Sequence, residues 1–211
     1  MVSVSATPPE LPTEVSLAPG LTLFAGENGN LPVTLRWIQP LFSPEAFAVD
    51  GDVVYAADEV ALHAFRLTDG IEAWQATNPV PEEGLFSDGG VRLGLADTDT
   101  IRLWAPFHFH LKVDRDTGEV RSFSYRARSR APRIQRFPAP RPNYYRIQNG
   151  LRRIVARAPN GEVAWHLTID RPEYDPKAAV AVPGGLVLVA PSGHLIVLDT
   201  PTFPDLPRTG Q

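Results

Sequence analysis

A short pattern recurs along this chain: an apolar run, a tight turn that contains glycine, and a segment that carries an aromatic residue. The pattern occurs at residues 61–74, 110–123 and 152–167. Self-similarity at a period of about 40 residues is typical of repeat proteins, in which every repeat forms one supersecondary unit. This pattern therefore constrains the fold more than any other feature of the sequence.

The segments that make up these repeats have the pattern of β-strands. Apolar and polar residues alternate with a period of two, and helical periodicity is almost absent. The clearest strands are short, rich in branched residues and bounded by Gly, Pro, Asp or Ser; they are residues 53–56, 101–104, 185–189 and 195–198. Strands separated by turns about every 8–12 residues are typical of an all-β sandwich, barrel or propeller.

Aligning the first unit with the last favours the propeller. Residues 48–67 and 181–199 share one order: strand, glycine turn, strand, polar turn, strand. The first unit continues through Thr68-Asp69-Gly70 into a fourth strand that carries Trp74. A unit of four antiparallel strands of this length is a propeller blade. We therefore expect an all-β fold, a small β-propeller of four or five four-stranded blades.

The units resemble the PQQ-like repeats of the quinoprotein-type β-propeller superfamily, over about residues 21–200. The residues that carry the resemblance are Ala64, Phe65, Thr68, Gly70 and Trp74 in the first unit, Val113, Asp114, Thr117, Gly118 and Phe123 in the second, and Ala156, Gly161 and Trp165 in the third. The quinone dehydrogenases of that superfamily use adjacent cysteines, a catalytic Asp and calcium. This chain has no cysteine, so the resemblance implies the repeat without the cofactor.

The last unit ends after its third strand, at Asp199. A candidate for its fourth strand lies near the N-terminus of the chain. Residues 33–37 form an apolar strand that carries Trp37, with no complete unit before it. Pairing this strand with the last unit would remove exposed sheet edges. We therefore expect units at about 45–80, 84–128, 129–170, and 174–200 together with 21–40, or a fifth unit if residues 15–44 fold separately.

So few blades imply a ring that is unusually small, open, or completed by a second copy of the chain or by another subunit. Residues 1–20 and 201–211 are rich in proline, and we expect them to be surface arms. The sequence has no signal-peptide pattern and no run of about 18 apolar residues, so we expect a cytoplasmic protein without a membrane span.

Positive charge is concentrated in one window of the sequence. Residues 121–160 contain eleven Arg and no Asp or Glu, whereas the rest of the chain holds nine Lys or Arg and 24 acids. Arg binds carboxylates and phosphates through two parallel hydrogen bonds and stacks on aromatic rings. We predict that an inter-blade region docks an acidic protein partner through Arg126, Arg128, Arg130, Arg133, Arg136, Arg141, Tyr144 and Tyr145.

Two alternatives remain for this window. Single-stranded nucleic acid is one, because aromatic residues interleave with the arginines. The other is that the arginines pair with the chain's own acids across neighbouring blades. No Ser-His-Asp order, phosphate-binding loop or HExxH motif occurs, so we expect a protein that is not an enzyme.

Four further features have a binding interpretation and a structural one. His108 and His110 would share one strand face and could form half of a metal site, with His63, His166 and His194 in comparable places, or they could be half-exposed strand positions. Residues 114–119 faintly resemble a calcium loop but lack its later acidic ligands, which favours an ordinary turn. Trp37, Trp74 and Trp165 stand in repeat register, which favours packing between blades over ligand stacking. Trp104 is out of register.

Overall fold

The computed structural model describes the backbone of residues 14–18, 21–25, 34–79, 91–105, 109–125, 145–148, 153–157, 163–169, 178–182, 184–190 and 193–199. Side chains are described for 34–79, 91–105, 109–125 and most of 179–199. Every regular element within these ranges is a β-strand. The all-β expectation is therefore confirmed for the described part of the chain.

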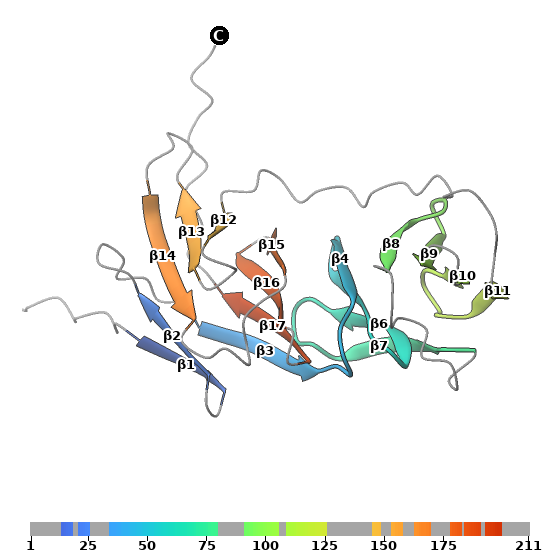
Figure 1. Cartoon of the computed structure of the whole chain (residues 1–211), viewed down its shortest axis with the longest axis horizontal. Helices are drawn as coiled ribbons and strands as arrows, with labels where there is room; N and C mark the ends of the chain where they lie inside the picture. Colours follow the sequence, from blue (N-terminus) through green and yellow to red (C-terminus); the bar gives the residue numbers. More distant parts are fainter. Residues whose placement is uncertain are drawn as a thin grey trace, which may run out of the picture.

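The strands form four antiparallel sheets, shown in Figure 1. Sheet I contains β4 (Ala46–Asp50), β5 (Val53–Ala57), β6 (Ala61–Arg66) and β7 (Glu72–Thr77). Sheet II contains β8 (Arg92–Leu95), β9 (Thr100–Ala105), β10 (Phe109–Asp114) and β11 (Val120–Tyr125). Sheet III contains β15 (Ala178–Val182), β16 (Gly185–Ala190), β17 (His194–Asp199) and β3 (Thr34–Pro40). Sheet IV contains β1 (Glu14–Ala18), β2 (Leu21–Ala25), β14 (Val163–Ile169), β13 (Arg153–Arg157) and β12 (Tyr145–Gln148).

The N-terminal strand completes the last unit of the chain. In sheet III, β3 pairs with β17, and Trp37 lies opposite Val197. The predicted pairing of residues 33–37 with the last unit is confirmed for the described residues 34–37. Of the wider segment 21–40, however, only Thr34–Pro40 lies in that sheet. Because β3 occupies the free edge of β17, Leu21–Ala25 pairs instead with the free edge of β14, in sheet IV.

Part of the N-terminal arm is also ordered into this sheet. Glu14–Ala18 forms β1, which pairs with β2 at the edge of sheet IV. The strands of sheet IV that come from the predicted third unit are therefore extended by a hairpin from the N-terminus. This differs from the expectation that residues 1–20 form an arm outside the sheets.

The sheets follow one another in a row, in the order IV, III, I, II (Figure 1). Contacts between neighbours join β12 with β15, β1 with β3, β15 with β4, and β4 with β8. Sheets II and IV lie at opposite ends of the row in Figure 1. Among the described strands, the row is therefore not closed into a ring.

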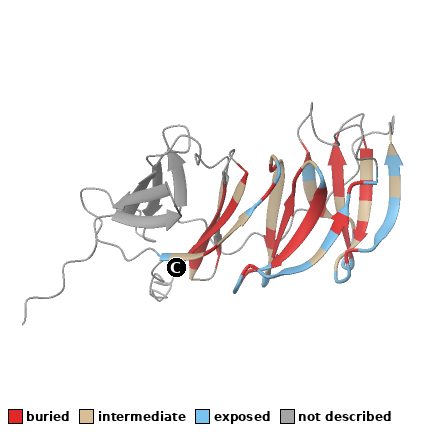
Figure 2. Cartoon of the chain, turned by 90° about the horizontal axis from the view of Figure 1, so that it is seen from below, coloured by how far each residue is buried: buried red, intermediate tan, exposed pale blue. Residues whose placement is uncertain are grey.

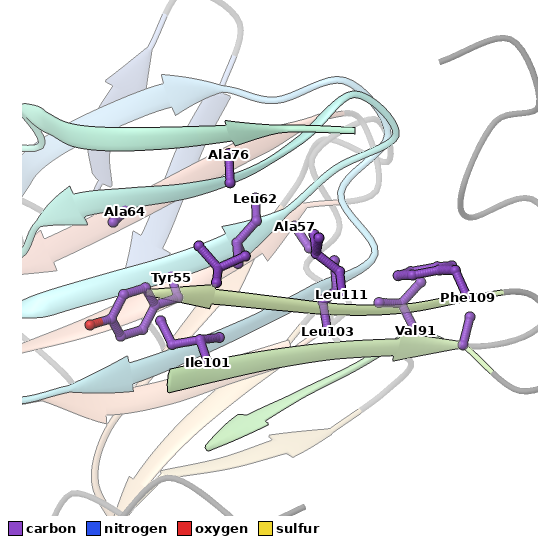
Figure 3. Packing of buried hydrophobic residues seen from close by; sticks show 12 residues of the cluster. Tyr55, Ala57, Leu62, Ala64, Ala76, Val91, Ile101, Leu103, Phe109 and Leu111 are labelled. Carbon is purple, nitrogen blue, oxygen red and sulfur yellow. The ribbon is translucent and has the colours of Figure 1, made fainter. Parts of the chain in front are cut away.

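Sheet I is buried on both faces because it lies between two others, as Figure 2 shows for the described residues. One face, with Tyr55 and Leu62, packs against Ile101, Leu103 and Leu111 of sheet II (Figure 3). The opposite face packs against sheet III through Val54, Ala56, Phe65, Val187, Val189 and Val197. This double burial explains why β5 and β6 are almost continuously apolar, since a strand covered on both faces needs no polar alternation.

The recurring tryptophan joins sheet III to sheet I and sheet I to sheet II. Trp37 of sheet III donates its indole N–H to the carbonyl oxygen of Leu67 in sheet I, at 2.9 Å. Trp74 of sheet I donates in the same way to the carbonyl oxygen of Arg115 in sheet II, at 3.0 Å. The prediction that these two tryptophans pack between units is confirmed, whereas the side chain of Trp165 lies outside the described residues.

The recurring glycine is the other half of this contact. Gly70 and Gly118 have positive φ angles of 72° and 75°. A Cβ atom added to Gly70 would lie 2.7 Å from Trp37 Cδ2, and one added to Gly118 would lie 2.7 Å from Trp74 Cε3. Each turn therefore requires glycine for two reasons. Its backbone is in the left-handed region, and a side chain would overlap the indole ring.

In every sheet a β-bulge comes directly before the register position that holds a tryptophan in sheets III, I and IV. The register shifts by one residue beside Trp37 in sheet III, beside Trp74 in sheet I and beside Trp165 in sheet IV. A bulge increases the local twist and changes the direction of a side chain. In sheet II the residue at the same place in the register is Ser122, opposite Lys112. Phe123, which the sequence alignment matched to this position, is one residue further on and packs against the cluster shared with sheet I.

Candidate interaction surface

The residues predicted to dock a partner fall largely outside the described part of the chain. Arg126, Arg128, Arg130, Arg133, Arg136, Arg141 and Tyr144 are not described. Tyr145 is the first residue of β12 and lies opposite Ala156 of β13. The connection that carries the six arginines joins β11 in sheet II with β12 in sheet IV, at the two ends of the row.

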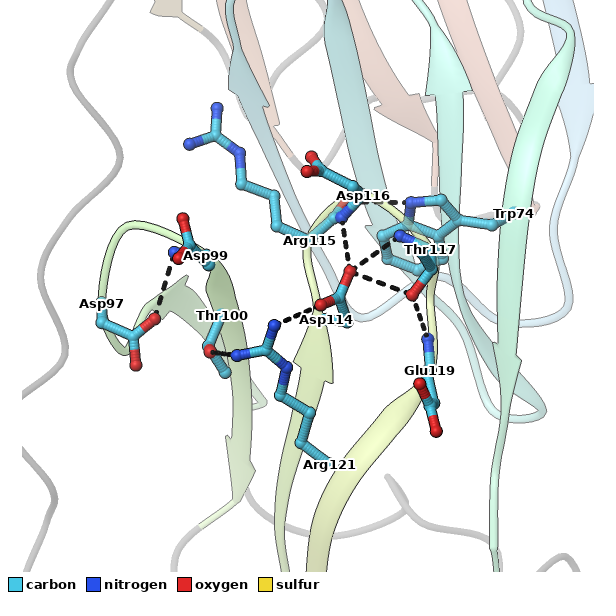
Figure 4. A network of polar contacts seen from close by, with 10 residues as sticks. All are labelled: Trp74, Asp97, Asp99, Thr100, Asp114, Arg115, Asp116, Thr117, Glu119 and Arg121. Atoms are coloured by element: carbon cyan, nitrogen blue, oxygen red, sulfur yellow. Dashed lines mark hydrogen bonds and ion pairs between the residues drawn. The ribbon is translucent and has the colours of Figure 1, made fainter.

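Arg121 is the arginine of the basic window whose side chain the structure describes. It donates to the carboxylate of Asp114 and to the hydroxyl of Thr100, the latter at 3.0 Å (Figure 4). This arginine is therefore paired with an acid of its own sheet, whereas the alternative predicted pairing across neighbouring blades. The docking prediction rests on the arginines that follow it.

The turn at residues 114–119 has a structural explanation. The carboxylate of Asp114 accepts hydrogen bonds from the backbone N–H groups of Thr117 and Asp116 and from the Thr117 hydroxyl, at 2.9–3.0 Å. The bond from the Thr117 backbone, together with Arg121, holds the pKa of Asp114 far below its usual range. The ionised side chain forms the turn on which Trp74 docks, which agrees with the turn interpretation of this motif.

The histidines predicted as possible metal ligands are distributed over different sheets. His110 lies on β10, opposite Trp104 and Ser124, and His108 lies outside the described residues. His63 belongs to sheet I, His194 to sheet III and His166 to sheet IV. Within the described ranges, no group of three or more His, Asp or Glu side chains is arranged to hold a metal ion.

His63 instead belongs to a buried polar cluster. Its Nδ1 lies 2.7 Å from Glu72 Oε1, its Nε2 lies 3.1 Å from Asp58 Oδ2, and its ring stacks on Phe65 with centroids 5.6 Å apart. Burial alone would lower the pKa of His63, but the two carboxylates outweigh burial and raise it. The residue is only 9% exposed, so its ring lies between two carboxylates and largely away from water.

This cluster joins separate segments of the fold. Asp58 accepts the backbone N–H groups of Phe42, Val60 and Ala61, each at 2.9 Å. Burial opposes ionisation of Asp58, but its contacts with His63 and these amides outweigh burial and lower its pKa. Because Phe42 follows β3, the cluster ties the connection between sheets III and I to the β5–β6 turn. Sequence analysis missed Asp58 and Glu72 because no known motif marks their spacing from His63.

Ion pairs also connect neighbouring sheets at the turns. Arg115 of sheet II lies 2.6 Å from Asp50 of sheet I and interacts with the Tyr55 hydroxyl. In sheet III, Arg36 pairs with Asp199 at 2.6 Å, and its guanidinium also donates to the carbonyl oxygen of Leu67 in sheet I at 3.3 Å. These arginines are engaged inside the molecule, so they are poor candidates for partner binding.

Comparisons with known proteins do not assign a family. No protein-family model and no curated protein matches the chain. Solved structures that match include BamB from Moraxella catarrhalis, at 13% identity, with 88% of this chain and 57% of that chain covered and a TM-score of 0.33. Virginiamycin B lyase from Staphylococcus aureus matches at 10% identity, 87% and 60% coverage, and a TM-score of 0.27. Glutaminyl cyclase from Myxococcus xanthus matches at 11% identity, 90% coverage of both chains, and a TM-score of 0.29.

At these identities and TM-scores, the matches assign neither a family nor an activity. The chain spans little more than half the length of the BamB chain that it matches. Among the described residues, no helix is long and apolar enough to cross a membrane.

Proposed function

We propose that this chain is a non-enzymatic scaffold or interaction subunit that docks an acidic protein partner through its arginine-rich connection. The docking residues are Arg126, Arg128, Arg130, Arg133, Arg136, Arg141, Tyr144 and Tyr145. The four sheets would be the blades of a small propeller with PQQ-like repeats, and the tryptophan–glycine contacts between sheets support this repeat type.

One observation carries the proposal: the position of the basic connection between β11 and β12. These strands belong to sheets II and IV, which lie at the two ends of the row. Six arginines without an acidic residue lie in this connection, between 126 and 141. A concentration of one charge attracts a partner of opposite charge and speeds its association.

The open row supports a role in assembly. A second copy of the chain or another subunit could complete the ring, as the small number of blades already suggested. In stacked repeat proteins the terminal repeats are the ones whose outer face is not covered by another repeat, so a subunit that completes the row would bind at the two end sheets.

Binding to single-stranded nucleic acid is the second candidate. The aromatic residues Phe137, Tyr144 and Tyr145 among the arginines favour it, because bases stack on such rings. Nucleic-acid affinity would fall linearly on a logarithmic scale with salt concentration and would show no preference for a protein partner.

Fluorescence anisotropy with two labelled probes tests the proposal: a peptide of alternating Glu and Ser, and a single-stranded oligonucleotide. The full chain is compared with a variant in which the six arginines are Gln and with a control in which they are Lys. At about 50 mM salt, we expect the Gln variant to lose at least about tenfold in peptide affinity, and the Lys control to lose less. Unchanged peptide binding by the Gln variant refutes the proposal, and tighter oligonucleotide binding replaces it with the second candidate.

A further inference from the structure

The outer face of sheet II lies at the end of the row, and no described strand packs against it (Figure 1). Alternate residues of β9 and β10, among them Leu103 and Leu111, point into the cluster shared with sheet I. The residues between them therefore lie on the outer face. Arg102 and Trp104 of β9 and Lys112 of β10 are the central members of this face.

The outer face also lacks a tryptophan like those that join sheet III to sheet I and sheet I to sheet II. Sheets III and I each present a tryptophan after the bulge, and that tryptophan docks on the next sheet. Sheet II presents the exposed Ser122 at this position. Among the described residues, sheet II therefore lacks the tryptophan contact through which a further blade of the same type would be joined.

The cations of this face lack a close counterpart among the described residues, although Lys112 interacts electrostatically with Asp97. Arg102 lies directly opposite Lys112 across the β9–β10 pair, and like charges in directly opposite positions destabilise a sheet. None of the described ion pairs includes Arg92, Arg102 or Lys112. Burial, together with the charge of Arg102, lowers the pKa of His110 on the same face. An anion placed here would relieve this repulsion.

Trp104 provides a second and independent sign of a missing acceptor. It is only 5% exposed, and its indole N–H has no hydrogen-bond partner among the described residues. The guanidinium carbon of Arg92 lies 5.3 Å from the centre of its ring, and His110 contacts the ring edge-on at 6.0 Å. Buried donors are rarely left unpaired, because losing water without a replacement acceptor is unfavourable. The outer face therefore combines an unpaired donor with unpaired cations.

The charge pattern identifies the occupant. A second copy of sheet IV is a poor match, because β12, β13 and β14 carry Arg146, Arg153 and Arg157 and no acid. A long polyanion is also a poor match, because acidic turns lie at one end of sheet II, with Asp97 and Asp99 before β9. Residues 102 and 104 are two positions apart, about 6.6 Å along a strand. Carboxylates at alternate positions of an extended peptide have the same spacing.

We infer that the outer face of sheet II binds a short, extended, acidic segment of a partner protein. One carboxylate is held between Arg102 and Lys112, and a second accepts the indole N–H of Trp104 beside Arg92. The inference shares the acidic partner of the proposed function but uses other residues. The two can therefore fail separately.

Nuclear magnetic resonance of the ¹⁵N-labelled full chain tests the site directly. The chain has four tryptophans, and the variant Trp104→Phe assigns the Trp104 indole signal. The probes are a peptide of alternating Glu and Ser, the same peptide with Gln in place of Glu, and a single-stranded oligonucleotide. We expect the Glu peptide to shift the Trp104 indole signal and the Gln peptide to leave it unchanged.

The double variant Arg102→Gln/Lys112→Gln is the decisive comparison. It should lower affinity for the Glu peptide by about tenfold or more, while its melting temperature stays equal or rises because the opposing charges are gone. Arg66→Gln, an exposed arginine on sheet I, is the matched control and should change affinity less than twofold or so. The variant lacking the six arginines at 126–141 should still show the Trp104 shift.

Three results would overturn the inference. The first is a Trp104 indole signal that does not shift when the Glu peptide is added. The second is a double variant that binds the Glu peptide with the same affinity as the unmodified chain. The third is an oligonucleotide that shifts Trp104 at lower concentration than the peptide. If only the six-arginine variant loses peptide binding, the proposed function stands and the site on sheet II does not. The reverse result supports the site on sheet II and removes the role of the arginine-rich connection.

Discussion

Replacing Gly70 with alanine should show how much the tryptophan contact contributes to the stacking of sheets. The chain offers a matched control in Gly51, which also has a positive φ, of 56°, but has no atom within 4 Å of an added Cβ. An alanine in this backbone region costs about 1–2 kcal/mol. Gly51→Ala should lose about this amount of unfolding free energy and nothing more.

Gly70→Ala has the same backbone cost and a second cost, which comes from the displacement of Trp37. Its Cβ would lie 2.7 Å from Trp37 Cδ2, so the ring has to move, and the buried hydrogen bond to Leu67 at 2.9 Å is broken. Leaving such groups buried and unpaired costs about 1–3 kcal/mol. We therefore expect Gly70→Ala to lose about 3–4 kcal/mol in total, about 2 kcal/mol more than the control.

Urea unfolding followed by circular dichroism measures this difference, because both variants keep all four tryptophans. With a urea dependence of about 2 kcal/mol per molar, the midpoint of Gly70→Ala should lie about 1 M below that of Gly51→Ala. Tryptophan emission should shift to longer wavelength in Gly70→Ala alone, as Trp37 is displaced toward water. Equal midpoints for the two variants would refute the idea that the glycine serves the inter-sheet contact.

Three further predictions concern the contacts between segments. The pKa of His63 is raised in the folded state, so its stabilising effect is complete below about pH 6.5 and is lost as the pH rises through the folded value. The stability difference between the unmodified chain and His63→Gln should therefore shrink between pH 6 and pH 9 or so, and a difference independent of pH in urea titrations would contradict this. Trp74→Phe keeps a ring but removes the N–H donated to Arg115, and differential scanning calorimetry should show a loss of about 1 kcal/mol. Arg115→Gln breaks the ion pair with Asp50 and should cost about 1 kcal/mol at low salt and measurably less in about 1 M salt, as urea titrations at the two salt concentrations would show.

Much of the fold could be predicted because strands and turns are local properties of the sequence. Short runs of branched apolar residues bounded by turn residues located β5, β9, β16 and β17, and the repeated glycine turn located their partners. The pairing of the N-terminal strand with the last unit was also predictable, since a unit with three strands has a free edge and Trp37 supplied the register. These features depend on neighbouring residues or on a count of strands within a repeat.

Features that depend on a shift of register could not be predicted. The bulges displace one residue beside Ala64 and beside Lys112, and nothing in the amino-acid composition marks them. As a result, Phe123 was matched to a position that Ser122 occupies. The cluster of Asp58, His63 and Glu72 was missed because strand pairing brings together side chains that are five and nine residues apart and carry no motif. The docking residues at 126–144 fall outside the described residues, so their role remains a prediction.

The tryptophan–glycine contact gives the row of sheets a direction, and this direction relates the fold to the proposed role. Sheet III donates a tryptophan to sheet I, and sheet I donates one to sheet II, where the series stops at Ser122. Each of these two contacts needs a tryptophan on one sheet and a glycine turn on the next. At its outer face, sheet II has cations and an unpaired indole N–H in place of the donor, so a further blade of the same type has no contact to make there. The proposed acidic partner would therefore bind at this end of the row, and the arginine-rich connection that leaves β11 begins at the same sheet.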